Sequence, residues 1–181
     1  MKTCLVGCGG IAAVHGSVLT SDIDTEFVAA ADIKPEKAQS YAENFHTKPY
    51  PSLESMLEAE KPDVLHICTP HYLHVPMTIY ALERNINVFM EKPPAISFDQ
   101  LEELKKAAAK SEAQLGFCYQ NRYNASIRAA KDLIDSGKAG KVLGARAFVT
   151  WCRGAAYYTE SGWRGSLKAE GGGVSINQSV H

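Results

Sequence analysis

A glycine-rich segment near the N-terminus constrains the fold of this chain more than any other feature. Residues 7–12 read Gly-Cys-Gly-Gly-Ile-Ala, between an apolar run over Thr3–Val6 and an amphipathic stretch over Ile11–Leu19. This is the pattern Gly-x-Gly-x-x-Gly/Ala of a strand–turn–helix unit that binds a dinucleotide. The first glycine permits the tight turn, and the second lets main-chain N–H groups approach a pyrophosphate at the positive end of the helix dipole. The segment predicts cofactor contacts at Gly7, Gly9, Gly10, Ile11 and Ala12.

An acidic residue stands where the dinucleotide pattern expects one. Asp32 closes the next apolar run, Phe27–Ala31, 20 residues after Ala12. A carboxylate here accepts hydrogen bonds from the adenosine ribose and repels the additional phosphate of NADP, which favours NAD. Lys34 is near enough to accept that phosphate, so NADP stays the alternative cofactor. Asp32 could also cap the helix expected from Pro35, and the two roles are compatible.

Short apolar runs alternate with longer amphipathic ones through the first two thirds of the chain. This alternation is typical of parallel strands covered by helices on both faces. Helices are expected over 11–19, 35–45, 52–60, from near 75 onward and over 101–110, with Ser52 as an N-cap and Ser97 with Gln100 as a capping box. Strands are expected at Thr3–Val6, Phe27–Ala31, Val64–Cys68, Asn87–Met90 and Gln114–Cys118.

The predicted fold class is therefore α/β. Residues 1–120 should form a Rossmann doubly wound parallel sheet with helices on both faces, as a dinucleotide-binding domain. The remaining part, 121–181, is interpreted as the incomplete start of an α+β second domain. A helix is expected there over Asn124–Ser136, a β-strand of alternating exposure over Lys141–Trp151, and the opening of another helix over Val174–His181.

The overall composition excludes several classes of partner. The 181 residues carry 19 basic and 20 acidic side chains, a net charge of -1, so no broad positive field exists for nucleic acid or an anionic membrane. No run approaches the ~20 apolar residues of a membrane span, and no signal peptide is evident. The 5 cysteines are scattered, as in reduced cytosolic proteins, and the spacing of Cys4 and Cys8 is not that of a metal site. We expect a cytoplasmic protein without a bound metal.

Further motifs follow the later strands, and together with the glycine-rich turn they resemble those of the Gfo/Idh/MocA family. Its members typically carry Thr-Pro-Asn-x-x-His, Glu-Lys-Pro, Gln/Asn-Arg-Phe/Tyr and Gly-Gly-Gly-x-x-x-Asp/Asn-x-x-x-His. His71 stands where the family usually has Asn, and Asn177 stands where Asp is commoner. The likeness covers the whole chain through Thr69–His74, Glu91-Lys92-Pro93, Tyr119–Tyr123, Trp163-Arg164 and Gly171–His181.

The resemblance implies an NAD(P)-dependent oxidoreductase. Such an enzyme transfers a hydride between the nicotinamide and a secondary hydroxyl of a sugar, nucleotide sugar or cyclitol. Lys92 is implied to bind the substrate hydroxyl, and His181 to act as base or proton relay near Asn177. A helix would place Asn177 and His181 on one face, because they are four residues apart. The implied additional cofactor contacts are Thr69, Pro70, His71, His74, Glu91, Lys92, Gln120, Asn121, Trp163 and Arg164.

Physical chemistry supports the same crevice without the family. Ligands of an open parallel sheet bind at the carboxyl ends of its strands, and Thr69, Lys92 and Gln120 all fall there. A hydroxyl proton must leave as the hydride leaves, and a lysine or histidine can take it. Simpler interpretations stay open: Lys92 as a solvated charge, His74 as a helix cap, and Trp163 as a packing residue.

Family members are usually much longer, with a second domain that supplies the substrate pocket and the oligomer interface. The resemblance therefore implies that this chain is truncated and that the full-length protein is a homo-oligomer. The alternative function is a non-catalytic NAD-binding module or regulatory subunit.

Overall fold

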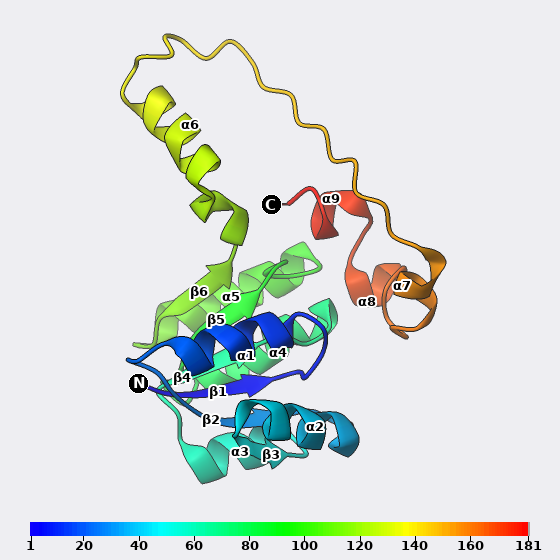
Figure 1. Ribbon diagram of the computed structural model, residues 1–181. Helices are drawn as coiled ribbons and strands as arrows, with labels where there is room; N and C mark the ends of the chain where they lie inside the picture. Colours follow the sequence, from blue (N-terminus) through cyan, green and yellow to red (C-terminus); the bar gives the residue numbers. More distant parts are fainter. Residues whose placement is uncertain (181) are drawn as a thin grey trace.

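Six parallel strands form the central sheet of residues 1–180, the part of the chain that the computed structural model describes (Figure 1). Their order, β3-β2-β1-β4-β5-β6, is that of a doubly wound Rossmann fold, as predicted. Val6 lies opposite Ala31 on one side and Ile67 on the other, so the carboxyl ends of three neighbouring strands meet at one edge. The strands are β1 (Lys2–Val6), β2 (Glu26–Ala31), β3 (Lys48–Tyr50), β4 (Val64–Ile67), β5 (Asn87–Glu91) and β6 (Leu115–Cys118).

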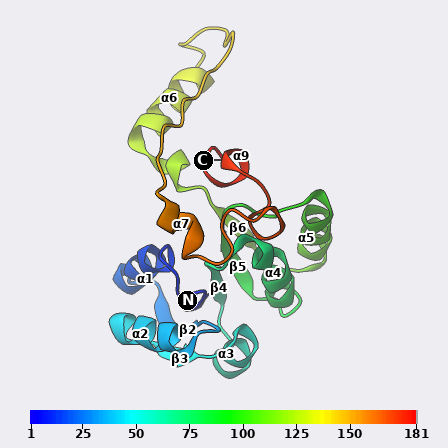
Figure 2. The ribbon, with the colours of Figure 1, turned by 90° about the vertical axis from the view of Figure 1, so that its right-hand side faces the viewer.

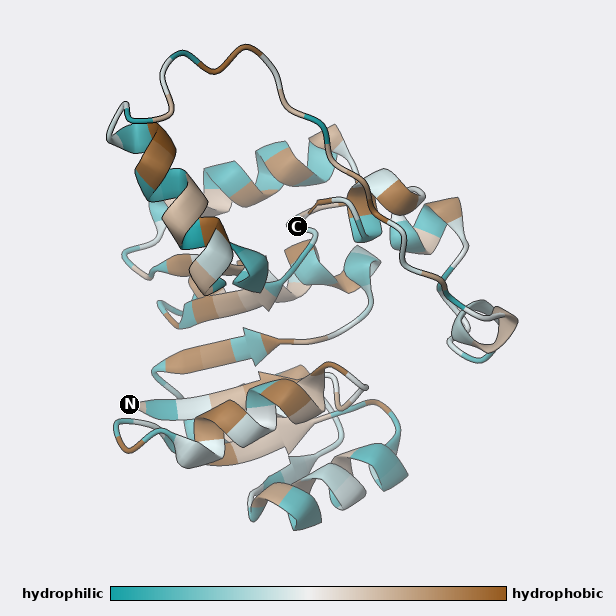
Figure 3. Cartoon of the chain, turned by 45° about the horizontal axis from the view of Figure 1, so that its top comes forward, coloured by the Kyte–Doolittle hydropathy of each residue, from teal (hydrophilic) through white to brown (hydrophobic). Residues whose placement is uncertain are grey.

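Helices cover both faces of this sheet (Figures 1 and 2). Side chains alternate along β1: Leu5 packs with residues of α1 (Ala12–Ser21) and α2 (Pro35–Phe45), whereas Cys4 and Val6 point to the opposite core. That second core is closed by α3 (Leu53–Glu60), α4 (His74–Leu82) and α5 (Phe98–Lys110). The strands are largely apolar and the helices carry mixed faces (Figure 3). Within residues 1–180, no helix is both long and apolar enough to cross a membrane.

The helix caps predicted at Ser52 and Ser97 are confirmed. Ser52 Oγ accepts a hydrogen bond from the N–H of Ser55 at 3.1 Å, and Ser97 Oγ accepts one from the N–H of Gln100 at 3.2 Å. The Gln100 side chain accepts a hydrogen bond from the N–H of Ile96 at 3.1 Å. The helix α5 begins at Phe98, three residues before the expected start at Leu101. Each cap satisfies main-chain donors that have no partner in the first turn of a helix.

The strand β3 was not predicted. It has three residues, of which Lys48 and Pro49 are exposed, and therefore carries no apolar run. It exists because its main chain pairs with β2, where Ala30 lies opposite Pro49. Edge strands of this kind are stabilised by pairing, which a search for buried runs does not detect.

The last third of the chain extends away from the sheet before returning to it. In Figure 1, α6 (Ala125–Asp135) projects from the end of β6, and a long connection leads back to α7 (Ala155–Thr159). The strand predicted over 141–151 is wrong: these residues are exposed, show no alternation, and pair with no strand within residues 1–180. A strand requires a neighbour for its main-chain groups, and sequence pattern alone does not supply one.

A buried carboxylate at the end of α3 ties together strands β1 and β3. Glu60, at the end of α3, accepts hydrogen bonds from Tyr50 Oη at 2.6 Å and Lys48 Nζ at 2.9 Å, and it pairs with Lys2 Nζ at 3.0 Å. These hydrogen bonds, led by the one from Tyr50, lower the pKa of Glu60 to about 2. The network links β1, β3 and α3.

This network predicts an acid-sensitive contribution to stability. Glu60→Gln should lower the free energy of unfolding at pH 7 by about 2 kcal/mol, which allows for the partial exposure of both lysines. Because the folded-state pKa is depressed, the contribution is complete above pH 4.5 and disappears as the pH falls towards 2. Urea denaturation between pH 7 and pH 2 measures it, with Glu58→Gln, an exposed site on the same helix, as the control. A difference between wild type and Glu60→Gln that persists undiminished at pH 2 would contradict the assignment.

Candidate active site

The glycine-rich turn is tight at its first glycine and open at its second. Gly7 has a φ of +93°, and a Cβ atom there would lie 2.8 Å from main-chain atoms of Cys68 and Thr69. A Cβ at Gly9 or Gly10 would meet nothing within 4 Å. A side chain at position 7 would therefore clash with the main chain, whereas the space over Gly9 is free for a ligand. Ile11 precedes α1 and is 40% exposed, and Ala12 is fully buried against the sheet.

Asp32 holds this turn in place. One carboxylate oxygen accepts a hydrogen bond from the N–H of Cys8 and the other accepts one from the N–H of Lys34, both at 2.9 Å. The residue before α2 is Lys34, so Asp32 organises the turn ahead of that helix and is not its N-cap. The carboxylate is only partly buried at the carboxyl end of β2, which leaves it accessible to a ribose hydroxyl.

Thr69 and Pro70 follow β4 and border the glycine-rich turn, because Thr69 N is one of the atoms closest to Gly7. The Oγ1 atom of Thr69 is buried and has no hydrogen-bond partner within residues 1–180. A buried hydroxyl without a partner is uncommon and points to a group that the chain itself does not supply. The open space over Gly9, the partly exposed Asp32 and this hydroxyl together fit a dinucleotide.

His74, the first residue of α4, is fully buried and joins two of the motif loops. Its Nδ1 lies 2.8 Å from the carbonyl oxygen of Pro93, and its Nε2 lies 2.9 Å from that of Thr69. Burial lowers the pKa of His74, and its hydrogen bonds to the two carbonyls oppose that shift. The side chain therefore ties the Thr-Pro loop to the Glu-Lys-Pro loop. Its contact with the cofactor stays a prediction.

Lys92 is held at the carboxyl end of β5 by a segment 85 residues further along the chain. Its Nζ donates to the main-chain carbonyl of Asn177 at 2.6 Å and to the side-chain Oδ1 of the same residue at 2.8 Å. Burial, the largest cause, lowers the pKa of Lys92 below its usual value. A desolvated lysine with a lowered pKa is suited to exchange a proton with a bound hydroxyl.

The helix predicted over 174–181 ends earlier than expected. α9 spans Val174–Asn177, so the expectation that a helix places Asn177 and residue 181 on one face is not confirmed. The main-chain carbonyl of Asn177, the last residue of α9, accepts from Lys92. His181, the predicted base or proton relay, lies outside the described residues.

His71, Trp163 and Arg164 meet above the same edge. The rings of His71 and Trp163 pack edge to face with centroids 4.7 Å apart, and the guanidinium of Arg164 lies 4.7 Å from the centre of the Trp163 ring. Burial lowers the pKa of His71 to about 4, so its imidazole is neutral and donates through Nδ1 to the carbonyl of Glu170 at 2.9 Å. These contacts dock the C-terminal segment onto the Thr-Pro loop.

Glu91 lies in a cluster of polar side chains beneath α1. His15 Nε2 donates to its carboxylate at 3.0 Å, and the Nδ1 atoms of His15 and His66 are 2.9 Å apart. Burial would raise the pKa of Glu91, but hydrogen bonds from His15 and Cys118 lower it overall. Donor atoms of His15, Glu91 and Cys118 lie within 4.8 Å of one another, and such donors also occur in zinc sites. The hydrogen bonds account for this geometry, and the cluster fixes the residue next to Lys92.

Two sequence profiles match this chain. The one described as the oxidoreductase family with an NAD-binding Rossmann fold matches residues 1–119, and that of the GFO/IDH/MocA C-terminal domain matches residues 127–181. The chain belongs to the Gfo/Idh/MocA family. The predicted resemblance is thereby confirmed, as is the nicotinamide-cofactor fold that it implied.

Relatives in the Gfo/Idh/MocA family include sugar and cyclitol dehydrogenases. A D-glucoside 3-dehydrogenase of Escherichia coli is 29% identical over all of this chain and 51% of its own length. An inositol 2-dehydrogenase/D-chiro-inositol 3-dehydrogenase of Lacticaseibacillus casei is 29% identical over 81% of this chain and 44% of its own length. The WlbA dehydrogenase of Chromobacterium violaceum, solved with NADH and UDP-GlcNAcA, superimposes with a TM-score of 0.95 at 32% identity, over all of this chain and 52% of that one. The chain spans about half the length of these relatives.

The Gfo/Idh/MocA motifs differ in how closely the structure brings them together. Lys92, Asn177, His71, Trp163 and Arg164 are linked through direct contacts or through Glu170. Gln120 and Asn121 lie in the turn η2 (Gln120–Tyr123) after β6, where Gln120 Oε1 is 3.8 Å from Cys118 Sγ. Their contact with the cofactor stays a prediction.

Three residues important to this Gfo/Idh/MocA site were missed from the sequence: His15, His66 and Glu170. His15 lies three residues after Ala12 and four before Leu19, on the stripe of α1 that faces the sheet. A histidine on an apolar stripe needs a polar partner, and this could have flagged it. Glu170 carries no spacing that distinguishes it from a surface acid.

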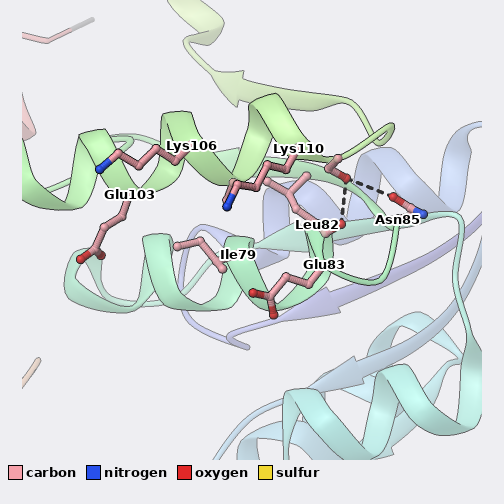
Figure 4. Close-up of a pocket in the computed structure, with 9 residues that line it drawn as sticks. Ile79, Leu82, Glu83, Asn85, Glu103, Lys106 and Lys110 are labelled. Atoms are coloured by element: carbon pink, nitrogen blue, oxygen red, sulfur yellow. Dashed lines mark hydrogen bonds between the residues drawn. The ribbon is translucent and has the colours of Figure 1, made fainter.

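A groove between α4 and α5 lies away from these motifs. Figure 4 shows its lining of helix side chains, including Ile79, Glu103 and Lys106. Ser111 Oγ closes one end by donating to the carbonyl of Leu82 at 2.8 Å. That end of both helices is opposite to the one that carries His74 and the Lys92 loop, so the groove is not part of the candidate active site.

Proposed function

We propose that the protein is an NAD(P)-dependent dehydrogenase that oxidises a secondary hydroxyl of a sugar, nucleotide sugar or cyclitol, or carries out the reverse reduction. The observation that carries the proposal is the placement of Lys92. Its half-buried ammonium is fixed on Asn177 at the edge of the sheet where the glycine-rich turn also ends. The names of the relatives support the substrate class, and they do not select one substrate within it.

In the proposed reaction Lys92 and His181 handle the proton of the substrate hydroxyl. When bound, the nicotinamide supplies the hydride acceptor. Two of the three ammonium hydrogens of Lys92 are bonded to Asn177 within the described part of the chain, which leaves one for the substrate hydroxyl. Because burial lowers the pKa of Lys92, the lysine can release that third proton, and as a neutral amine it still donates twice to Asn177 while its lone pair takes the hydroxyl proton as the carbon–hydrogen bond breaks. His181 is proposed to pass that proton on.

A cofactor titration followed by a substrate screen tests this function. Quenching of protein fluorescence should show binding of NAD, and more weakly of NADP, because Asp32 repels the additional phosphate. Asp32→Asn should lower the ratio of NAD to NADP affinity by about tenfold. NADH formation is then measured with sugars, nucleotide sugars and cyclitols. Binding without turnover on the whole panel would favour a non-catalytic NAD-binding module, and an NAD to NADP ratio unchanged in Asp32→Asn would contradict the role of Asp32.

A further inference from the structure

The amide of Asn177 has two unlike ends, and only one of them suits Lys92. Its Oδ1 accepts a hydrogen bond from the ammonium at 2.8 Å. If the amide were turned over, its NH2 group would face the ammonium, and two donors would oppose each other in a buried place. The position of Lys92 therefore depends on what fixes the amide.

The opposite end of the amide points to a buried carboxylate. Asn177 Nδ2 donates a short hydrogen bond to Glu170 Oε1 and lies 3.4 Å from Tyr157 Oη. A carboxylate has no hydrogen to donate, so it accepts only the NH2 end of the amide. The ammonium form of Lys92 can only donate and the carboxylate of Glu170 can only accept, and the two together determine the orientation of Asn177.

Glu170 is itself firmly held. It is 3% exposed, its Oε2 accepts from the N–H of Gly165 at 2.6 Å, and its main-chain carbonyl accepts from His71. The next residue, Gly171, has a φ of +90°, and a Cβ there would lie 2.5 Å from Ile96 Cβ. The close approach that glycine allows brings the end of α8 (Leu167–Glu170) against the loop that follows Lys92.

We propose that Glu170 is a positioning residue that orients the amide of Asn177 and thereby places the ammonium of Lys92. This inference deepens the proposed function and rests on it, because it matters for catalysis only if Lys92 handles the substrate hydroxyl. An acid in place of Asn177 would pair directly with Lys92. Here the carboxylate of Glu170 contacts Asn177 on the side away from Lys92, and the lysine itself contacts two neutral oxygens of Asn177.

The arrangement has a chemical consequence. A directly paired carboxylate would favour the charged form of Lys92 and hold its pKa high. Neutral carbonyl acceptors position the ammonium without that full charge, so burial can keep the pKa of Lys92 lowered.

The test measures the pKa of Lys92 directly and needs no turnover. The chain is labelled with [ε-13C]lysine, and the Lys92 signal is assigned by its loss in Lys92→Met and followed through a pH titration. Glu170→Gln keeps the shape but cannot accept from both Gly165 and Asn177, so the amide should turn over. We expect the pKa of Lys92 to fall by about 1.

A background variant separates orientation from simple loss of charge. In Asn177→Ala no amide is present, so adding Glu170→Gln should produce a clearly smaller fall than it does beside Asn177. An equal fall in the pKa of Lys92 in the two backgrounds would show that Glu170 acts on Lys92 only through its charge, and this result would overturn the proposal.

The exchange Glu170→Gln/Asn177→Asp gives a second, independent measurement. The new amide can accept from Gly165 and donate to Asp at 177, which then pairs with Lys92. The pKa of Lys92 should rise above the wild-type value, and any local unfolding caused by Glu170→Gln should be repaired. A double variant that stays unfolded, or whose Lys92 pKa remains at or below that of wild type, would overturn the proposal. Failure of the dehydrogenase assay would leave these measurements unaffected.

Discussion

Replacing Gly7 by alanine should destabilise the fold by about 3 kcal/mol or more, whereas the same change at Gly9 should leave stability within about 0.5 kcal/mol. At position 7 the added Cβ meets main-chain atoms of Cys68 and Thr69, directly after β4, at 2.8 Å, and the φ of +93° is unfavourable for alanine. The main chain of a buried parallel sheet cannot shift without losing hydrogen bonds between its strands. At Gly9 the added atom meets nothing within 4 Å.

The two variants should separate further in cofactor binding. Gly9→Ala is expected to fold normally and to lose NAD affinity by at least about tenfold, because the methyl group occupies the space over the turn that a pyrophosphate needs. Urea denaturation and fluorescence titration with NAD, run in parallel on both variants, measure the two effects. Wild-type NAD affinity in Gly9→Ala would place the cofactor elsewhere. Wild-type stability in Gly7→Ala would contradict the close approach of the turn to Cys68 and Thr69.

The parts of the fold that were predicted correctly are those in which local pattern and tertiary environment agree. β1, β2, β4 and β5 lie inside the sheet, and helices cover both of its faces, so each of them has an apolar run that can be recognised in the sequence. The edge strand β6 is only half-buried, but its short apolar run was recognised as well. The same reasoning failed at β3, which is held by pairing along an exposed edge. It also failed at 141–151, where the sequence alternates but no strand of residues 1–180 pairs with the segment. Pairing is a property of two segments, and neither segment reveals it alone.

The candidate site shows a similar division. The spacing of the glycines predicted the position of the turn and of the acidic residue Asp32, because few other sequences fit a turn this tight. The contact between Lys92 and Asn177 joins residues 85 apart, and Glu170 acts through that contact. No periodicity encodes such a relation, so the supporting residues of the site could be found only in three dimensions.

Replacing Lys92 by methionine should abolish turnover while leaving NAD affinity close to that of wild type. Methionine fills a similar volume but cannot hold a hydroxyl or take its proton, and losing that proton transfer costs roughly 10²–10⁴-fold in rate. The residues expected to bind the pyrophosphate and the ribose, Gly9 and Asp32, lie in a different loop from Lys92, and no hydrogen bond links Lys92 to either within the described residues. NADH formation with the substrate found in the screen measures the first effect, and fluorescence titration measures the second.

Two further substitutions make the Lys92 result specific. Lys168→Met removes an exposed lysine from α8 and should leave turnover unchanged, which excludes a general effect of lost positive charge. Lys92→Arg keeps the charge but has a pKa too high to exchange a proton and a planar group in place of a point charge, so it should not restore turnover. If Lys92→Met lost NAD affinity and turnover to the same extent, the role of Lys92 would be to bind the cofactor, not to act on the substrate hydroxyl. In that case the proton would have to be taken by another group at this edge of the sheet, and His181 would be the next residue to replace.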